Sequence, residues 1–107
     1  MQILFRGEMK KPYGMKDSEF YGVWLEEAKA AVAALKAGAI KGIWKVAGKN
    51  IVIGIIDVPD GESFNAMLMQ LPVFAKGYSF LNNMDYDVLT SYEDWAGVME
   101  KHLKTCT

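Results

Sequence analysis

A chain of 107 residues has room for one domain with one hydrophobic core, and not for two. Its formal net charge of -1 supplies no basic field of the kind that holds a nucleic-acid backbone, so we expect no nucleic-acid partner. Hydrophobic residues make up 51% of the chain, which is rich for this size and indicates that another subunit covers part of the surface.

The N-terminal segment and the cysteine content favour a cytoplasmic protein. Arg6 and Glu8 interrupt the first apolar run, so we expect no secretory signal, and no stretch approaches the ~20 apolar residues of a membrane span. The single cysteine, Cys106, excludes an intrachain disulfide. Cys106 and the single histidine, His102, lie near the end of the chain, and we interpret the pair as incidental, with no metal site.

The first predicted elements are a strand and a long helix. Gln2 to Met9 alternates between two faces, as a strand does. Residues 10–15 contain a proline and a glycine and form a loop. Asp17 or Ser18 then caps an amphipathic helix that Gly38 ends.

Glu27 is the anomaly of this helix, because it falls in the middle of the apolar sector while Glu26 points away. At about 100° per residue, the sector consists of Phe20, Val23, Trp24, Ala31, Ala34 and Leu35. Burial raises the pKa of a carboxyl group towards the range where it takes and returns a proton. The pattern thus predicts a base at Glu27. The alternatives are a side chain that reaches water past the alanines and one that pairs with a basic residue on an adjacent strand.

Residues 40–58 read as a hairpin with its turn at residues 48–50. The return strand, residues 51–58, is apolar on both faces, which is typical of a sheet that is covered on both sides. Because the helices of so small a domain cover one face only, we expect another copy of the sheet to cover the other. Gly54 predicts a bulge in preference to a close approach by a ligand or backbone.

A second helix and a fourth strand follow. Asp60 caps the helix, which runs to about Gln70 and carries a core stripe of apolar residues. Residues 75–83 have no clear period and read as a lid, a binding loop or a segment beneath a neighbouring subunit. The alternation from residue 84 to 90 predicts the strand, and we interpret Asp85 and Asp87 as its solvated face rather than a metal or acid/base site.

Ser91 caps a final helix over residues 91–104. Its apolar stripe, which must cover either its own sheet or a neighbour's, is Tyr92, Trp95, Val98, Met99 and Leu103. The order strand, helix, strand, strand, helix, strand is the ferredoxin-like arrangement. We therefore predict an α+β fold in one domain, residues 1–107: a βαββαβ unit whose antiparallel sheet carries helices on one face, plus an appended C-terminal helix.

A set of short motifs spreads over residues 4–74. They are Leu4-Phe5, Glu8-Met9, the loop proline with Met15, Ala37-Gly38, Ile43-Trp44-Lys45-Val46-Ala47-Gly48-Lys49, Asp57-Val58 and Leu71-Pro72-Val73-Phe74. Together they resemble the muconolactone delta-isomerase family, and the hairpin run and the final tetrad are the most specific. The resemblance implies a subunit of the dimeric α/β-barrel type in a symmetric homo-oligomer, without metal or organic cofactor.

The resemblance also implies the chemistry of aromatic catabolism: an isomerase that moves a proton along an unsaturated lactone, from muconolactone to the 3-oxoadipate enol-lactone. Glu27 matches an acidic position of the family's first helix, in a register that leaves Glu26 open. Lys45 takes the place of a basic residue, usually Arg, and is a candidate partner of the lactone carboxylate. The return strand is apolar where the family has Tyr and Asn, which indicates a bulkier or less polar ligand.

Further candidate binding residues come from several elements. They are Arg6, Lys49 and Asn50 as polar partners of the substrate, and Trp24, Trp44 and Phe74 as pocket walls. For the two tryptophans, a place in the core or in a subunit interface is favoured over a contact with the ligand.

Two other functions are open on the same scaffold. A cofactor-independent monooxygenase or a cyclase also needs an apolar, aromatic pocket with few polar groups. A non-catalytic binding or assembly protein would explain the apolar return strand, whereas the inward Glu27 argues against it.

Overall fold

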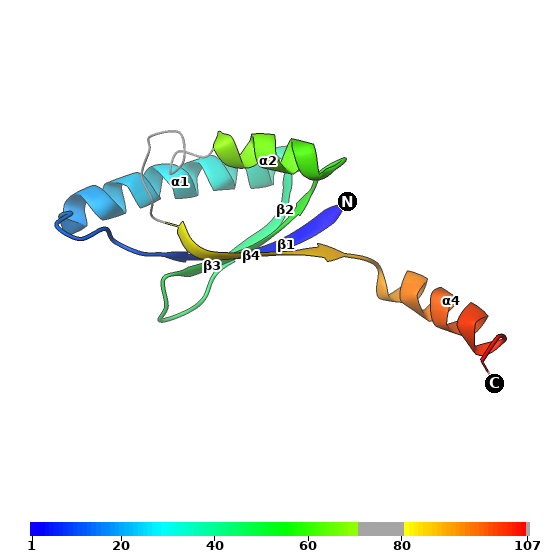
Figure 1. Cartoon of the computed structure of the whole chain (residues 1–107). Coiled ribbons are helices and arrows are strands. Elements are labelled where there is room, and N and C mark those ends of the chain that lie inside the picture. Colours follow the sequence, from blue (N-terminus) through cyan, green and yellow to red (C-terminus); the bar gives the residue numbers. More distant parts are fainter. Residues whose placement is uncertain (71–80, 107) are drawn as a thin grey trace.

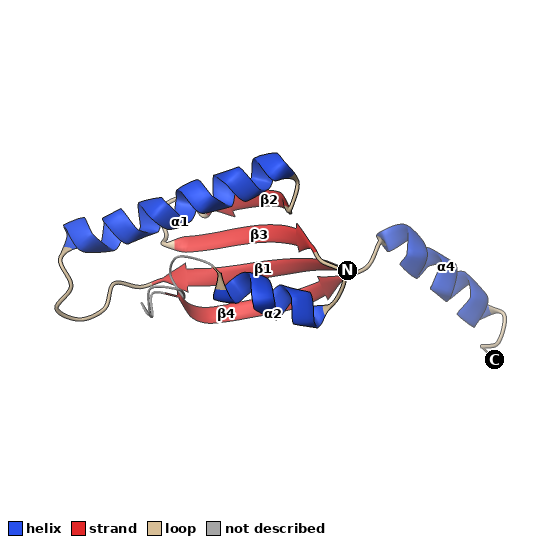
Figure 2. Cartoon of the chain, turned by 90° about the horizontal axis from the view of Figure 1, so that it is seen from above, coloured by secondary structure: helices blue, strands red, loops and turns tan. Residues whose placement is uncertain are grey.

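A four-stranded antiparallel sheet with two helices on one face forms the body of the protein (Figure 1). The computed structural model describes residues 1–70 and 81–106. The elements are β1 (Gln2–Met9), α1 (Asp17–Ala37), β2 (Ile40–Lys45), β3 (Ile51–Asp57), α2 (Gly61–Met69), β4 (Leu81–Leu89) and α4 (Tyr92–Leu103). The strand order is β2-β3-β1-β4, which confirms the predicted ferredoxin-like arrangement with an added helix. Figure 2 shows α1 on the β2 side of the sheet and α2 on the β4 side.

The helix ends follow the sequence with one correction. Neither Asp17 nor Ser18 caps α1: Lys16 occupies the N-cap position without a side-chain bond, and Asp17 accepts a hydrogen bond from Lys11 Nζ at 2.6 Å. Gly38 ends α1 with φ of 87°, as predicted. Asp60 caps α2, because its Oδ1 accepts the Ser63 N–H at 2.8 Å. This bond lowers the pKa of Asp60.

Gly54 lies in a regular part of the sheet, so the predicted bulge is wrong. It pairs with Phe5 of β1 and with Ile43 of β2 without a shift of register. The Phe5 ring occupies the space above it, and a β-carbon at position 54 would lie 2.4 Å from that ring. A side chain therefore makes the close approach that requires glycine here.

The hydrophobic core lies between the sheet and the two helices, and it is divided into two clusters. The larger cluster consists of Ile3, Ala31, Ile40, Ile56, Val58 and Phe64, and the smaller one of Met9, Phe20 and Val23. α1 contributes to both clusters, with Phe20 and Val23 near its start and Ala31 one helical turn beyond Glu27. Leu35, predicted to share this sector, is 37% exposed and lies outside it.

None of the helices in residues 1–70 and 81–106 lies over the opposite face of the sheet, as Figure 1 shows. Ile53 and Ile55 of β3 are only half-buried on this open face. α4 does not cover it, because α4 lies beyond the end of β4 (Figure 2). The radius of gyration is 17.5 Å, against about 13 Å for a compact chain of this length. The apolar stripe of α4 was predicted to cover either its own sheet or a neighbour's, and the structure excludes the first of these.

No helix within the described ranges combines the length and the apolar character that crossing a membrane requires.

Candidate active site

A cavity of about 340 Å³ lies beneath α1, where the two core clusters meet. Its walls include Met9, Trp24 and Val52 beside the smaller cluster and Phe5, Ala31, Ile43, Ile56, Phe64 and Met67 beside the larger one. Met84 of β4 lines it as well. This volume is within the range of small-molecule sites, and the walls are mostly apolar.

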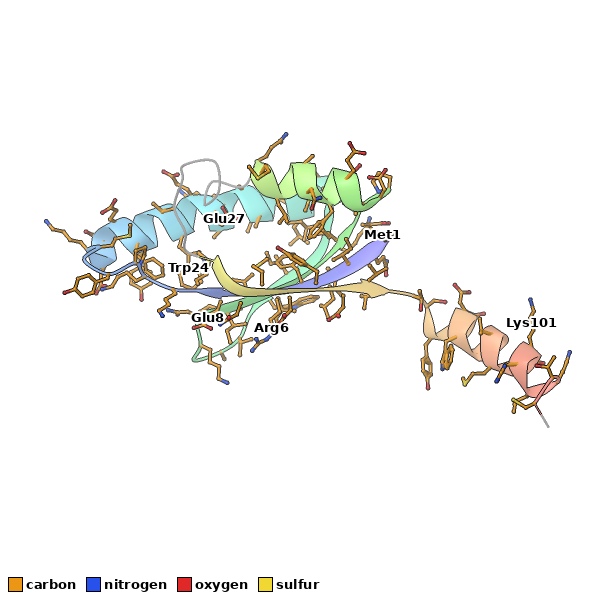
Figure 3. All side chains as sticks on the ribbon, viewed as in Figure 1. Met1, Arg6, Glu8, Trp24, Glu27 and Lys101 are labelled. Atoms are coloured by element: carbon orange, nitrogen blue, oxygen red, sulfur yellow. The ribbon has the colours of Figure 1, made fainter. Side chains whose placement is uncertain are left out.

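Glu27 lines this cavity and is half-buried. It stands on α1 four residues after Val23 and four before Ala31, both of which are buried against the sheet. Because residues four apart share one helix face, the packing of these neighbours turns Glu27 towards the cavity. Figure 3 shows Glu27 on the side of α1 that faces the sheet. Glu26 is exposed, as its place on the helix predicts.

Lys45 lines the same cavity from the end of β2. Lys45 and Ile43 lie two residues apart on β2, so their side chains are on the same face of the sheet. Ile43 packs against the larger core cluster, so this is the face that the helices cover. Lys45 Nζ donates a hydrogen bond to the backbone carbonyl oxygen of Val46 at 3.2 Å. Among the described lining residues, Glu27 and Lys45 are the two that carry a charge.

Trp24 and Trp44 both contribute to the walls. Trp24 is half-buried and stacks on Tyr21, with ring centroids 6.3 Å apart and an interplanar angle of 11°. Trp44 belongs to the edge strand β2 and is 57% exposed, with its ring against Gly42. Trp24 is thus a fixed wall of the cavity, whereas Trp44 lies at its rim.

Other predicted binding residues lie elsewhere. Arg6 stands on the open face of the sheet, on the side away from Glu27, and its cross-strand neighbours are Ile53 and Asp85 (Figure 3). Lys49 and Asn50 line a separate, polar hollow beside the β2–β3 turn. The structure therefore brings Glu27, Lys45 and Trp24 together, with Trp44 at the edge of the cavity. The other three polar candidates lie outside this cavity. Phe74 lies outside the described residues.

Several wall residues carry no chemical signal in the sequence, so sequence reasoning did not single them out. Phe5 and Met84 are examples, and only the alternation of their strands indicates that they face the helices. Tyr86 lies on the same face and packs edge-on against Phe64, with ring centroids 4.9 Å apart. Burial raises the pKa of the Tyr86 phenol.

Asp85 and Asp87 are exposed side chains of β4 on the open face of the sheet. Within residues 1–70 and 81–106, no three His, Cys, Asp or Glu side chains come together in a way that could hold a metal ion.

Comparison with known proteins agrees with this architecture. The chain is similar to a crystal structure of muconolactone isomerase, with a TM-score of 0.71, 24% identity, and coverage of 86% of this chain and 91% of that one. It is also similar to 5-chloro-2-hydroxyhydroquinone dehydrochlorinase from Burkholderia phenoliruptrix AC1100, with a TM-score of 0.60, 11% identity, and coverage of 88% and 98%. No curated protein gives a significant match. The model of the muconolactone delta-isomerase family matches residues 1–93, and the chain therefore belongs to that family.

Proposed function

We propose that this protein is a cofactor-independent isomerase that moves a proton within a small unsaturated lactone or a related enolisable carbonyl compound. The observation that carries the proposal is the pair of charged groups, Glu27 and Lys45, in the wall of an otherwise apolar cavity. Membership of the muconolactone delta-isomerase family supports the reaction class. Muconolactone isomerase itself is only 24% identical to this chain, so its substrate is not carried over directly.

The proposed reaction needs one base. The Glu27 carboxylate takes a proton from the carbon that the carbonyl group acidifies, which leaves an enolate and a neutral carboxylic acid. The same acid then returns the proton to another carbon of the conjugated system, so the double bond moves and no atom is gained or lost. Lys45 Nζ supplies a positive charge for the anionic group of the substrate or for the enolate oxygen. The mostly apolar walls lower the local dielectric constant, which strengthens the interactions of Lys45 with these negative charges.

A proton-exchange assay tests this proposal. The protein is incubated in deuterated water with muconolactone and a panel of unsaturated lactones, and NMR follows isomerisation and incorporation of deuterium. Glu27→Gln should abolish both, whereas Glu26→Gln changes the exposed neighbour on the same helix and should leave them within about twofold of wild type. Equal loss in the two variants would remove Glu27 from the role of base. Absence of both isomerisation and exchange with every lactone in the wild-type protein would overturn the isomerase proposal for these substrates.

A second chemistry on this scaffold has one supporting observation. The dehydrochlorinase shares the fold at 11% identity, so this architecture serves more than one reaction. A monooxygenase or cyclase would use the same apolar cavity. Consumption of oxygen by the purified protein in the presence of a phenolic ligand would favour the monooxygenase.

We also propose that the chain is a homo-oligomer in which the open face of the sheet packs against another copy. Ile53, Ile55 and Leu4 are half-buried there, although none of the described helices covers them. Apolar side chains on an uncovered sheet face are typical of a surface that a subunit interface buries. Light scattering of the wild-type protein and of Ile55→Lys tests this, and we expect a smaller particle for the variant.

A further inference from the structure

A second apolar stripe runs along α1, beside the one that faces the sheet. Its residues, here called the α1 stripe, are Tyr21, Leu25, Ala28, Val32 and Leu35, at spacings of four, three, four and three. This is the spacing of a helix seam that packs on another helix. All five are exposed, with exposed fractions from 37% at Leu35 to 56% at Tyr21 for the four large ones. The α1 stripe is therefore a helix-packing surface that the described chain leaves open.

α4 carries a matching surface. Its apolar residues, here called the α4 stripe, are Tyr92, Trp95, Val98, Met99 and Leu103, and their exposed fractions range from 38% to 79%. An isolated helix of 12 residues is marginal in water, so α4 needs a surface to pack on. At 1.5 Å per residue the α4 stripe is about 17 Å long, and the α1 stripe, from Tyr21 to Leu35, is about 21 Å long. The α1 stripe is thus long enough to accept the whole α4 stripe.

The α4 of one chain cannot lie along its own α1. α1 packs over β2, at one edge of the sheet, whereas α4 follows β4, at the other edge. Three strand spacings separate these edges, about 14 Å. Thr90 and Ser91 are the only residues between β4 and α4, and two residues span at most about 7 Å. An α1 surface that α4 packs on must therefore belong to another molecule.

The charges of the two helices select an antiparallel pair. α4 has Glu93 and Asp94 in its first turn and Lys101 in its last, and α1 likewise has acidic residues in its first turn and Lys36 in its last. In an antiparallel arrangement with the start of α4 beside the end of the α1 stripe, Glu93 and Asp94 lie near Lys36 and the helix dipoles oppose each other. A parallel arrangement over the same segment places Lys101 near Lys36, which is unfavourable. Two α4 helices could satisfy the same rule with each other, but the α1 stripe would then stay exposed.

We propose that α4 docks antiparallel onto the α1 stripe of a second copy of this chain. In a twofold pair each copy donates one α4 and accepts one, so both stripes are buried. The match to the family model ends at residue 93, so α4 is a feature of this chain beyond the family unit. Ala28 and Val32 of the α1 stripe also line the cavity, whereas Leu25 and Trp95 do not, so changes at these two positions test the docking apart from the proposed activity.

A complementation experiment with two variants tests the docking. Leu25→Asp places a charge in the α1 stripe and leaves α4 intact, whereas Trp95→Asp does the reverse. Both positions are exposed in the single chain, so neither change disturbs its own body. Ala33→Asp, at an exposed position of α1 outside the stripe, is the matched control. The readout is amide hydrogen exchange of residues 92–103, measured by mass spectrometry with one variant labelled with ¹⁵N.

We expect α4 amides to exchange about tenfold or more slowly in the wild-type and control proteins than in either variant alone. Mixing the two variants should restore slow exchange in α4 of the Leu25→Asp chain only, because only that chain has an intact α4 and only the other has an intact acceptor. Fast exchange of α4 in the wild-type protein would overturn the proposal. So would slow exchange in Leu25→Asp alone, since α4 would then pack on another surface, such as a second α4.

Discussion

α1 and α4 have the same kind of apolar periodicity and opposite degrees of burial. On α1, Phe20 is 2% exposed and Ala31 9%, whereas α4 has no buried residue. The difference lies in connectivity. α1 joins β1 to β2, so the chain must return across the sheet and the helix is held over it. After α4 no described strand brings the chain back, and its apolar face is left for another molecule. Periodicity thus indicates which side of a helix is apolar, and topology decides what covers it.

The largest expected difference in stability is between alanine substitutions of one aromatic residue in each helix. Phe20→Ala removes a ring from the smaller core cluster and should lower the free energy of unfolding by about 3–5 kcal/mol. Tyr92→Ala removes a ring that is 79% exposed and should change it by no more than about 0.5 kcal/mol. Urea unfolding followed by circular dichroism, at the lowest practical protein concentration, measures both. Similar losses would show that α4 belongs to the same cooperative unit as the sheet.

Alanine substitutions of Gly54 and Gly61 compare a crowded position of the sheet with an open position at the start of α2. A methyl group at Gly54 would meet the Phe5 ring at 2.4 Å, so Gly54→Ala should destabilise the fold by about 1–3 kcal/mol. Because Phe5 lines the cavity, the displaced ring should also reduce ligand binding or turnover. Gly61→Ala adds the same methyl group where no atom lies within 4 Å, and it should be nearly neutral. A neutral Gly54→Ala would mean that the ring moves freely and that the close approach does not explain the glycine.

The sequence predicted most of the fold because its signals are local. Alternation of apolar and polar residues predicted the strands, and Asp60 and Ser91 were predicted correctly as helix caps. The position of Glu27 on the helix wheel predicted the one carboxylate of the described cavity wall. Errors arose where a competing contact decided the outcome. Asp17 binds Lys11 instead of capping α1, and a ring from another strand, not a bulge, accounts for Gly54.

The cavity could be predicted less well than the fold. Strand parity put Lys45 with Ile43 but did not say which face meets α1, and the structure resolves this in favour of the helix side. Arg6 and Lys49 differ from Lys45 only in the face or turn they occupy, which depends on long-range pairing of strands. Residue type alone therefore predicts more polar cavity residues than the structure contains.

Two helical glycines allow a smaller test of the difference between α1 and α4. Gly22 of α1 and Gly97 of α4 both have open space where a β-carbon would lie. Alanine in place of either should stabilise its helix by about 0.5–1 kcal/mol, since glycine is the poorer helix former. For Gly22→Ala the gain should appear in global unfolding, because α1 is packed on the sheet. For Gly97→Ala it should appear only as slower amide exchange in α4. A gain in global stability from Gly97→Ala would contradict the separation of the two regions.

The smallest effect concerns the two helix caps, which have equivalent geometry and different chemistry. Asp60 accepts the Ser63 N–H at 2.8 Å and Ser91 accepts the Asp94 N–H at 2.9 Å. The bond to Ser63 lowers the pKa of Asp60, so folding favours its charged form. Its contribution to stability is present above the usual pKa of an aspartate and is lost as the pH falls through the lowered value.

Asp60→Ala should therefore lower the free energy of unfolding at pH 7, and the deficit should shrink as the pH falls below about 4. Ser91→Ala should reduce the helix content of α4 equally at both pH values, because a hydroxyl group does not titrate in this range. Urea unfolding at a series of pH values measures the first effect, and hydrogen exchange of α4 the second. A deficit for Asp60→Ala that grows in acid would mean that the neutral carboxyl group caps α2 better than the charged one. The bond to Ser63 would then not be what sets the charge of Asp60.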